Sequence, residues 1–445
     1  MSAETLTILM FVILLILIFL GHPLAFTLGA IATVFGLIGW GGDYNLVMNL
    51  FINKIYGIIT NYVLVAIPLF IFMAQVLDAS GIAEKLFKAM YVIVGWIPGG
   101  LAIATILACT IFASSTGIVG AVEVAMGLLA GPALLKRGYS PQLVAGAICG
   151  GGTLGILIPP SIMLVVYGGL QGLSVGQLFA GAIFPGLILA GSYVLYIFVR
   201  CLINPKMGPP ISKEERMKYT FKEKLKLTVE SLIPPMVLII LVLGSIVAGV
   251  ATPTEAAGMG SIGSILLALA YRKLSWNVLK ESAIKTLKTT CMVMVLFIGG
   301  NCFSSVFMGL GGGDTLASLL LGISQNKYVI LAIMQFTLFI LGMFIDWLGI
   351  LLICVPVFSP VAAQLGFDPL WYATLICVNL QMSFLTPPFG YSLFYLKGIN
   401  LEGLKMADIY KGVVPFVILQ ASTVVACIIW PKIILYLPHL FFARR

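Results

Sequence analysis

Ten long apolar segments, separated by short polar loops, constrain the fold of this chain more than any other feature of its sequence. Of its residues 60% are hydrophobic and only 9% are charged, whereas soluble domains carry about 25% charged residues. A membrane-spanning helix needs about 20 mostly apolar residues, and in lipid every backbone polar group must be bonded within the protein. The segments therefore predict an all-α polytopic membrane protein with about ten transmembrane helices. They cover residues 5–20, 24–40, 63–77, 142–167, 178–203, 231–250, 254–271, 289–310, 369–396 and 412–436.

Two further apolar stretches, residues 99–135 and 329–363, are too long for one helix and are interrupted. The first is broken by Ser114-Ser115-Thr116-Gly117, and the second between Gly342 and Asp346. Such a stretch fits two half-helices that meet at a polar tip, because irregular backbone at membrane depth must be surrounded by protein or line a cavity. We therefore expect two re-entrant hairpins. Two full spans in each stretch are the alternative.

The distribution of basic residues predicts how the chain is oriented. When successive spans are traced as alternating crossings, 20 of the 25 Lys and Arg residues fall on one side of the membrane. By the positive-inside rule that side is cytoplasmic, which leaves both termini facing outward. The basic residues are scattered among short loops, so a nucleic-acid partner is not expected. Interfacial helices are expected at about 82–95, 213–230 and 272–288, with solvated loops as the alternative for the last two.

The chain matches itself without gaps at an offset of 228 residues, with 10 identities in 36 aligned positions. Each half contains five crossings, an odd number, so the second copy is inserted upside down. We expect inverted-topology repeats over residues 1–215 and 216–445, each with a hairpin followed by a broken helix, at about 142–168 or 369–396. Inverted repeats with broken helices are typical of secondary transporters, whose site lies near the bilayer midplane. The matched positions include Pro132 with Pro360, Pro141 with Pro369, and Leu157-x-Pro159-Pro160 with Leu385-x-Pro387-Pro388.

The hairpin tips and the double-proline breaks contain the residues that could bind an ion or a substrate. Proline removes a backbone donor and clashes with the preceding turn, so each Pro-Pro pair should unwind its helix. Carbonyl groups at the C-terminus of a half-helix suit a cation such as Na⁺, and half-helix N-termini suit an anion. No Lys or Arg occurs in these four segments of the sequence. An anionic substrate would therefore be held by helix N-termini, hydroxyl groups and bound cations.

Single residues differ in how strongly they indicate a site. Asp346 lies at the second tip, where an ionised carboxylate needs a partner that a bound cation would supply. For each Ser or Thr taken alone, a hydrogen bond to its own helix is the alternative. Glu123 fits a structural hydrogen bond and the ion path equally well, whereas Glu255 and Thr252 form the pattern of a helix capping box. The sequence has no paired catalytic groups and no Cys/His metal motif, so an enzyme is not expected.

These residues also resemble a known family. The chain is similar over essentially its whole length to the large membrane subunit, the M subunit, of tripartite ATP-independent periplasmic (TRAP) transporters, within the ion-transporter superfamily. The first tip departs slightly from the Ser-Gly-Ser form common in that family. The resemblance is carried by Ala66-Ile67-Pro68-Leu69-Phe70, Ser114-Ser115-Thr116-Gly117, Leu154-Gly155-Ile156-Leu157-Ile158-Pro159-Pro160-Ser161, Tyr167-Gly168, Thr252-Pro253-Thr254-Glu255-Ala256-Ala257 and Leu385-Thr386-Pro387-Pro388-Phe389-Gly390.

The resemblance implies a Na⁺-driven importer of organic acid anions in the bacterial inner membrane. It implies two partners: a periplasmic substrate-binding protein, and a small four-helix membrane subunit of the Q type, expected as a separate chain. It also implies an elevator, in which hairpins and broken helices form a transport domain that slides against a scaffold domain. A stand-alone Na⁺/dicarboxylate symporter or Na⁺/H⁺ antiporter of the same superfamily is the alternative, and a passive anion channel is an alternative of another class. The substrate stays open among carboxylates, keto acids, sugar acids and sulfonates.

Two Na⁺ sites, each pairing a hairpin tip with the neighbouring break, follow from the same resemblance. The residues expected at Na⁺ are Ser114, Ser115, Gly117, Gly152, Gly155, Gly342, Asp346 and Thr386. The residues expected to contact the substrate are Ser115, Thr116, Ser161, Thr386 and Pro387.

Overall fold

The computed structural model describes residues 2–117, 119–212, 214, 220–388 and 390–442, and every regular element in these ranges is helical. This confirms the prediction of an all-α polytopic membrane protein. The first half contains α1 (Ala3–Phe19), α2 (Leu24–Gly39), α3 (Tyr44–Ile59), α4 (Ala66–Ala79), α5 (Ile82–Val94), α6 (Gly100–Thr116), α7 (Val119–Lys136), α8 (Pro141–Thr153), α9 (Ile162–Gln171) and α10 (Val175–Ile203). The second half contains α12 (Phe221–Val247), α13 (Pro253–Ala270), α14 (Trp276–Gly309), α15 (Gly312–Ile323), α16 (Lys327–Gly342), α17 (Trp347–Gln364), α18 (Pro369–Leu385), α19 (Tyr391–Gly398), α20 (Met406–Ile429) and α21 (Lys432–Phe442). Short 3₁₀ turns occupy Tyr62–Val65, Leu154–Ile156 and Pro205–Met207.

Seven helices of the described residues are long and apolar enough to cross a membrane. The number is eight if α15 and α16, which are bent by 119° at their junction, form one span. The expected ten crossings also include α1 and α2, which are apolar but have only 17 and 16 residues. Of the seven, α7 and α17 are arms of the predicted hairpins, and the other five coincide with expected crossings. The remaining expected crossings fall on α1, α2 and α13, and on two helices interrupted at the double prolines, α8 with α9 and α18 with α19.

Helix starts follow the capping chemistry of the sequence, as α13 illustrates. The backbone N–H of Thr252 donates to Glu255 Oε2 at 2.7 Å, and Thr252 Oγ1 accepts from the N–H of Glu255 at 3.3 Å. Pro253 occupies the first helical position, where its missing N–H is not needed. Glu255 therefore completes the capping box that the sequence predicts.

Two helices continue where the sequence suggested a boundary between an interfacial helix and a span. The interval 272–288 lies mainly in α14, which is one continuous helix of 34 residues. Similarly, residues 221–230 of the interval 213–230 belong to α12, a helix of 27 residues that runs through Pro234 and Pro235. Charged residues at helical spacing mark the first turns of these long helices, not separate interfacial helices. In contrast, α5 covers nearly all of the interval 82–95.

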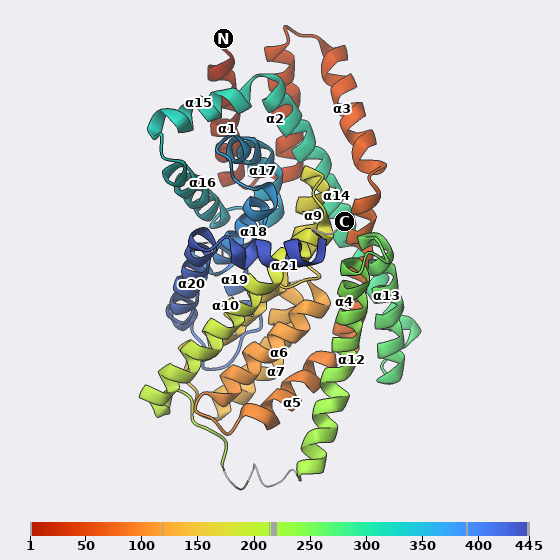
Figure 1. The fold of residues 1–445 in the computed structure, drawn as a ribbon, viewed down its shortest axis with the longest axis vertical. Helices are drawn as coiled ribbons and strands as arrows, with labels where there is room; N and C mark the ends of the chain where they lie inside the picture. Colours follow the sequence, from red (N-terminus) through yellow and green to blue (C-terminus); the bar gives the residue numbers. More distant parts are fainter. Residues whose placement is uncertain (1, 118, 213, 215–219, 389, 443–445) are drawn as a thin grey trace.

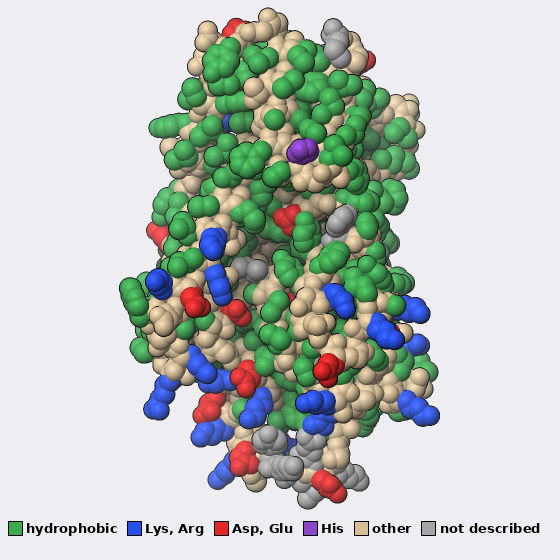
Figure 2. All heavy atoms as spheres, turned by 180° about the vertical axis from the view of Figure 1, so that it is seen from behind, with side chains coloured by type: hydrophobic (Ala, Val, Ile, Leu, Met, Phe, Trp, Pro, Cys, Tyr) green, Lys and Arg blue, Asp and Glu red, His purple; other side chains and the backbone are tan. Residues whose placement is uncertain are grey.

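The two helix pairs at the predicted hairpins lie in different parts of the molecule. In Figure 1 the pair α6 and α7 lies in the lower half and α17 in the upper half, with α18 and α21 between them. The face in Figure 2 shows most of its Lys and Arg side chains in the lower half, whereas the upper half is mainly hydrophobic. This uneven distribution agrees with the charge asymmetry of the sequence.

The centre of the molecule is formed by α8 and α18, which are buried almost throughout. Here Gln381 Nε2 donates to the carbonyl oxygen of Thr153 at 2.9 Å, and Gln420 Nε2 donates to Thr153 Oγ1 at 3.2 Å. Positions 153 and 381 are separated by the repeat offset of 228 residues. Residues related by a two-fold axis can touch only close to that axis. If the two halves are related as the repeat predicts, the pseudo-two-fold axis would pass close to this contact, between α8 and α18.

Candidate functional site

The tip between α6 and α7 lies against the first double-proline break. Gly117 ends α6 in the left-handed conformation, with φ of 65°. A Cβ atom at Gly117 would lie 2.7 Å from the carbonyl oxygen of Pro160. Because only glycine adopts this conformation at little cost and leaves that space, Gly117 permits the tip to approach the break. The break itself separates α8 from α9 and contains a cis peptide bond between Pro159 and Pro160.

The tip between α16 and α17 lies against the second break in a similar way. A Cβ atom at Gly342 would overlap the hydroxyl group of Ser383, near the end of α18. Asp346 precedes α17 as its N-cap and accepts a hydrogen bond from the N–H of Leu348 at 3.3 Å. The following break contains Thr386 and a cis peptide bond between Pro387 and Pro388. Each tip is thus placed beside the break that follows it in the chain.

The hydroxyl groups at the tips and breaks donate their protons locally. Ser115 Oγ donates to the carbonyl oxygen of Phe112 at 2.7 Å, and Thr386 Oγ1 donates to that of Met382 at 2.6 Å. Ser114, Thr116 and Ser161 likewise donate to carbonyl groups of nearby residues. A hydroxyl whose proton is used in this way still offers its oxygen lone pairs. This arrangement suits a cation better than an anion.

A cavity of about 850 Å³ meets both tips and both breaks. Of the residues predicted for the site, its described lining contains Gly117 and Asp346, but not Ser115, Thr116, Ser161, Thr386 or Pro387. Ile156 and Ile162 flank the first break, and Phe384 and Tyr391 flank the second. The opposite wall comes from the start of α2, from α4 and from α14. The cavity therefore lies between the paired tips and breaks on one side and the helices α2, α4 and α14 on the other.

The described lining of this cavity has one acidic side chain, Asp346, and contains no Lys, Arg or His. His22, Lys288 and Lys397 are near lining residues in the sequence, but they do not belong to that lining. The N-termini of α9 and α19 reach the cavity at Ile162 and Tyr391, and no side chain caps either helix. A free helix N-terminus carries a partial charge of roughly +0.5. The positive potential of the lining thus comes from backbone N–H groups.

Several residues that line the cavity could not be recognised as site residues from the sequence. Gln75 from α4 and Thr289 and Cys291 from α14 line the wall opposite the tips. Gln75 is an isolated polar residue in an apolar helix, and Thr289 and Cys291 lie where the charged start of α14 meets its apolar part. All three lie outside the aligned repeat. Their only distinguishing feature is polarity at membrane depth, which is shared by many Ser and Thr residues of the chain.

Glu123 occupies a separate buried position on α7. The Ser392 hydroxyl of α19 donates to its Oε1 atom, and within the described residues Oε2 has no hydrogen-bond partner. A Cβ atom at Gly152 would overlap the Glu123 side chain. Gly152, predicted at a Na⁺ site, therefore packs against Glu123. Glu123 itself makes a structural hydrogen bond, which is one of the two roles that the sequence suggested for it.

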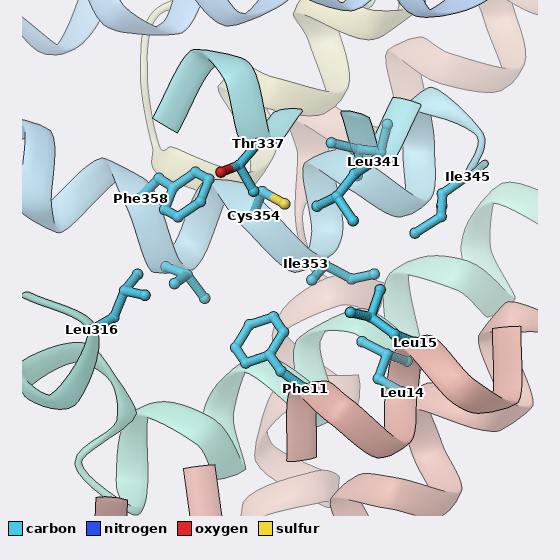
Figure 3. Close-up of a pocket in the computed structure, with 12 residues that line it drawn as sticks. Phe11, Leu14, Leu15, Leu316, Thr337, Leu341, Ile345, Ile353, Cys354 and Phe358 are labelled. Carbon is cyan, nitrogen blue, oxygen red and sulfur yellow. The ribbon is translucent and has the colours of Figure 1, made fainter. Parts of the chain in front are cut away.

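A second cavity, of about 180 Å³, lies between hairpin helices α16 and α17 and the neighbouring α1 and α15 (Figure 3). Its walls are apolar and include Phe11, Leu316 and Ile353. The one hydroxyl group, on Thr337, donates to the carbonyl oxygen of Ile333 at 2.9 Å. Its described walls carry no charge, and the Cys354 thiol is only a weak donor, so this cavity suits neither the ion nor an anionic substrate.

Comparison with known proteins places the chain among membrane permeases. The family model "Tripartite ATP-independent periplasmic transporter, DctM component" matches residues 11–433. The C4-dicarboxylate TRAP transporter large permease protein DctM of Vibrio cholerae is 30% identical over 432 residues, covering 92% of each chain. The ectoine/5-hydroxyectoine TRAP transporter large permease protein UehC of Ruegeria pomeroyi is 30% identical over 436 residues, covering 98% of this chain and 99% of the relative. The crystal structure of the Alcanivorax borkumensis YdaH transporter superposes with a TM-score of 0.66 at 16% identity, covering 96% of this chain and 98% of that one, and shows a shared fold.

Proposed function

Because the chain belongs to the DctM-component family of tripartite ATP-independent periplasmic transporters, we propose that it is the permease subunit of a Na⁺-coupled importer of a small organic acid anion. It acts in the bacterial inner membrane with both termini in the periplasm. A periplasmic substrate-binding protein delivers the anion, and a small four-helix membrane subunit packs beside the permease. Relatives named for C4-dicarboxylates and for ectoine support a cargo among small carboxylates.

The observation that carries this proposal is one cavity shared by both tips, both breaks and the helices α2, α4 and α14. In an elevator, such a cavity separates the part that moves from the part that stays fixed in the membrane. We assign α6 to α9 and α16 to α19 to the moving part. The fixed part includes α2, α4 and α14. Movement of α6 to α9 and α16 to α19 would expose the cavity first to one side of the membrane and then to the other.

Sodium ions have a chemically suitable environment at the two tips. Asp346 supplies a full negative charge at the cavity, and the back-bonded hydroxyl groups supply neutral oxygen atoms. Hard cations such as Na⁺ prefer oxygen ligands of both kinds. A bound cation would offset the cost of an ionised carboxylate at membrane depth, which translocon scales put at about 3 kcal/mol.

Reconstitution tests the proposal directly. The permease, its small membrane subunit and the binding protein should take up substrate into proteoliposomes only with an inward Na⁺ gradient. The permease alone should be inactive. Robust Na⁺-driven uptake by this chain alone would instead favour a stand-alone symporter, and flux independent of Na⁺ would favour a channel.

A further inference from the structure

We propose that the apolar cavity of Figure 3 binds an acyl chain of a membrane phospholipid, and that its filling holds the second hairpin in its present position. This cavity is distinct from the central one and is lined by α1, α15, α16 and α17. Its occupancy by a lipid does not depend on the proposed function. The effect of that occupancy on transport rests on the proposed division into a moving and a fixed part.

The chemistry of the cavity walls selects an apolar occupant. The described lining is aliphatic or aromatic except for Thr337, whose hydroxyl already donates to Ile333, and Cys354, whose thiol is a weak donor. A buried water needs two to four polar partners, and an apolar cavity of about 150 Å³ stays dry but binds benzene. The cavity here has a volume of about 180 Å³. It should therefore exclude water, with room for roughly six or seven carbon atoms of a chain.

The surroundings of the cavity identify the bilayer as the source of that chain. Exposed apolar side chains, Val12 and Ile16 of α1 and Leu319 of α15, border the half-buried lining residues Leu15 and Leu316. A helix of a partner subunit is about 10 Å wide, which is too wide for this volume, whereas a single acyl chain fits. Lipid tails are as apolar as leucine, so the chain gains no transfer free energy by entering. It gains the dispersion contacts that the walls would otherwise lack.

The cavity lies across the boundary between the proposed fixed and moving parts. Its α1 wall is attached to α14, because Phe11 packs edge to face against Phe303 and Phe307, with ring centroids 5.8 and 5.0 Å apart. The opposite wall is the second hairpin, with Leu341 at the end of α16 and Ile353 on α17. Movement of this hairpin relative to α14 would separate the two walls. A ligand favours the conformation to which it binds more tightly, so a chain that fills the intact cavity stabilises the present arrangement.

One residue connects the apolar cavity with the proposed ion site. Ile345 lines both the apolar and the central cavity, and it directly precedes Asp346. On the other side of the tip, Ile350 also lines the apolar cavity, and a Cβ atom at Gly342 would lie 3.4 Å from Ile350 Cδ1. A chain in the cavity therefore supports the second tip on both sides of Asp346.

Photo-crosslinking tests which molecule fills the cavity. The complex of this chain with its small membrane subunit is reconstituted in phosphatidylethanolamine liposomes in which some lipids carry a diazirine on one acyl chain. Adducts are located by mass spectrometry after illumination. Cys354 is the diagnostic position, because it lines the cavity and is only 3% exposed. We expect a lipid adduct at Cys354.

Two results of this experiment would overturn the proposal. The first is no adduct at Cys354 in any preparation. The second is an adduct in the permease alone that disappears in the complex, which would show that the small membrane subunit covers the cavity.

A cavity-filling variant tests the effect on the hairpin. Leu15→Trp places a larger side chain in the cavity from α1, whereas Ile16→Trp adds the same bulk at the neighbouring position, which is 52% exposed and does not line the cavity. We expect Leu15→Trp to lower the yield of the Cys354 adduct at least fivefold. It should also lower Na⁺-driven uptake by the three-part complex at least tenfold, with an undiminished melting temperature. Ile16→Trp should match the unmodified complex in all three measurements.

The remaining outcomes separate the parts of the inference. Unchanged uptake in a folded Leu15→Trp complex with little adduct would refute the effect on the hairpin. An equal loss of adduct in both variants would refute the cavity as the lipid site. If Leu15→Trp does not fold, Leu316→Phe fills the same cavity from α15 and faces the same criteria. Absence of Na⁺-driven uptake in the unmodified complex would count against the proposed function, while the adduct at Cys354 still decides whether the lipid binds.

Discussion

Replacing Asp346 by Asn isolates the contribution of one charge to the proposed Na⁺ binding. The side chain of Asp346 caps α17 by accepting a hydrogen bond from the N–H of Leu348 at 3.3 Å. Asn caps helices as well as Asp does, so the stability of the protein should change by less than about 0.5 kcal/mol. The substitution therefore removes a negative charge from the cavity while it preserves the local backbone.

The effect of Asp346→Asn on Na⁺ affinity should be large. Two unit charges 4 Å apart attract each other by about 4 kcal/mol at an effective dielectric constant of about 20, and the amide dipole retains only part of that attraction. A net loss of about 2 kcal/mol weakens binding roughly 30-fold, since about 1.4 kcal/mol corresponds to a factor of ten. The Na⁺ concentration for half-maximal uptake should rise by about that factor.

Uptake by the reconstituted three-part complex, measured against Na⁺ concentration at constant ionic strength, tests this expectation. Glu255→Gln is the matched control, because Gln also completes a capping box and Glu255 lies at the start of α13, outside the cavity lining. An unchanged Na⁺ curve for Asp346→Asn would show that Asp346 only caps α17, and it would remove this residue from the proposed ion site.

Three further predictions address the topology, the first tip and the buried Glu123. A cysteine at position 136 should be labelled only from the cytoplasm and one at position 368 only from the periplasm of intact cells; external labelling at 136 would refute the inverted topology. Gly117→Ala should reduce transport at least tenfold, because its Cβ would lie 2.7 Å from the Pro160 oxygen, whereas Gly138→Ala shares the positive φ but meets no atom within 4 Å and should transport normally. Ser392→Ala should lower the stability of the complex by about 1–3 kcal/mol, since it leaves a buried carboxyl group without its donor; an unaltered melting temperature would show that Glu123 finds another partner.

The elements that the sequence predicted well are those marked by residues with strong backbone effects. The tips contain Gly117 and Gly342, the breaks contain double prolines, and α13 begins at a capping box, so their positions follow from local sterics and hydrogen bonding. The repeat added a long-range constraint, because a match at an offset of 228 residues relates segments that propensity alone cannot connect. These features were sufficient to locate the tips and the breaks along the chain, whereas the pairing of each tip with its break was implied by the family resemblance.

Other features depend on tertiary context and could not be predicted in the same way. The helix α3, between residues 44 and 59, was not predicted because Asn45, Asn49 and Asn53 lower its apolar character. The helix α14 was divided in two because Lys280, Lys285 and Lys288 resemble an interfacial segment, yet no proline separates them from the apolar part. The wall formed by α2, α4 and α14 depends on packing between helices that share no motif.

The absence of a basic side chain from the described lining bears on the coupling mechanism itself. A lysine or arginine in the cavity would bind an anion whether or not Na⁺ were present, and the anion could then move down its own gradient. With Asp346 as the one acidic group of that lining, an anion entering alone meets a negative charge, and the two helix N-termini provide only about one compensating charge. Binding of a cation beside Asp346 removes this repulsion and so raises the affinity for the anion. By thermodynamic linkage the anion raises the affinity for the cation by the same factor, which is one requirement for cotransport in the proposed mechanism.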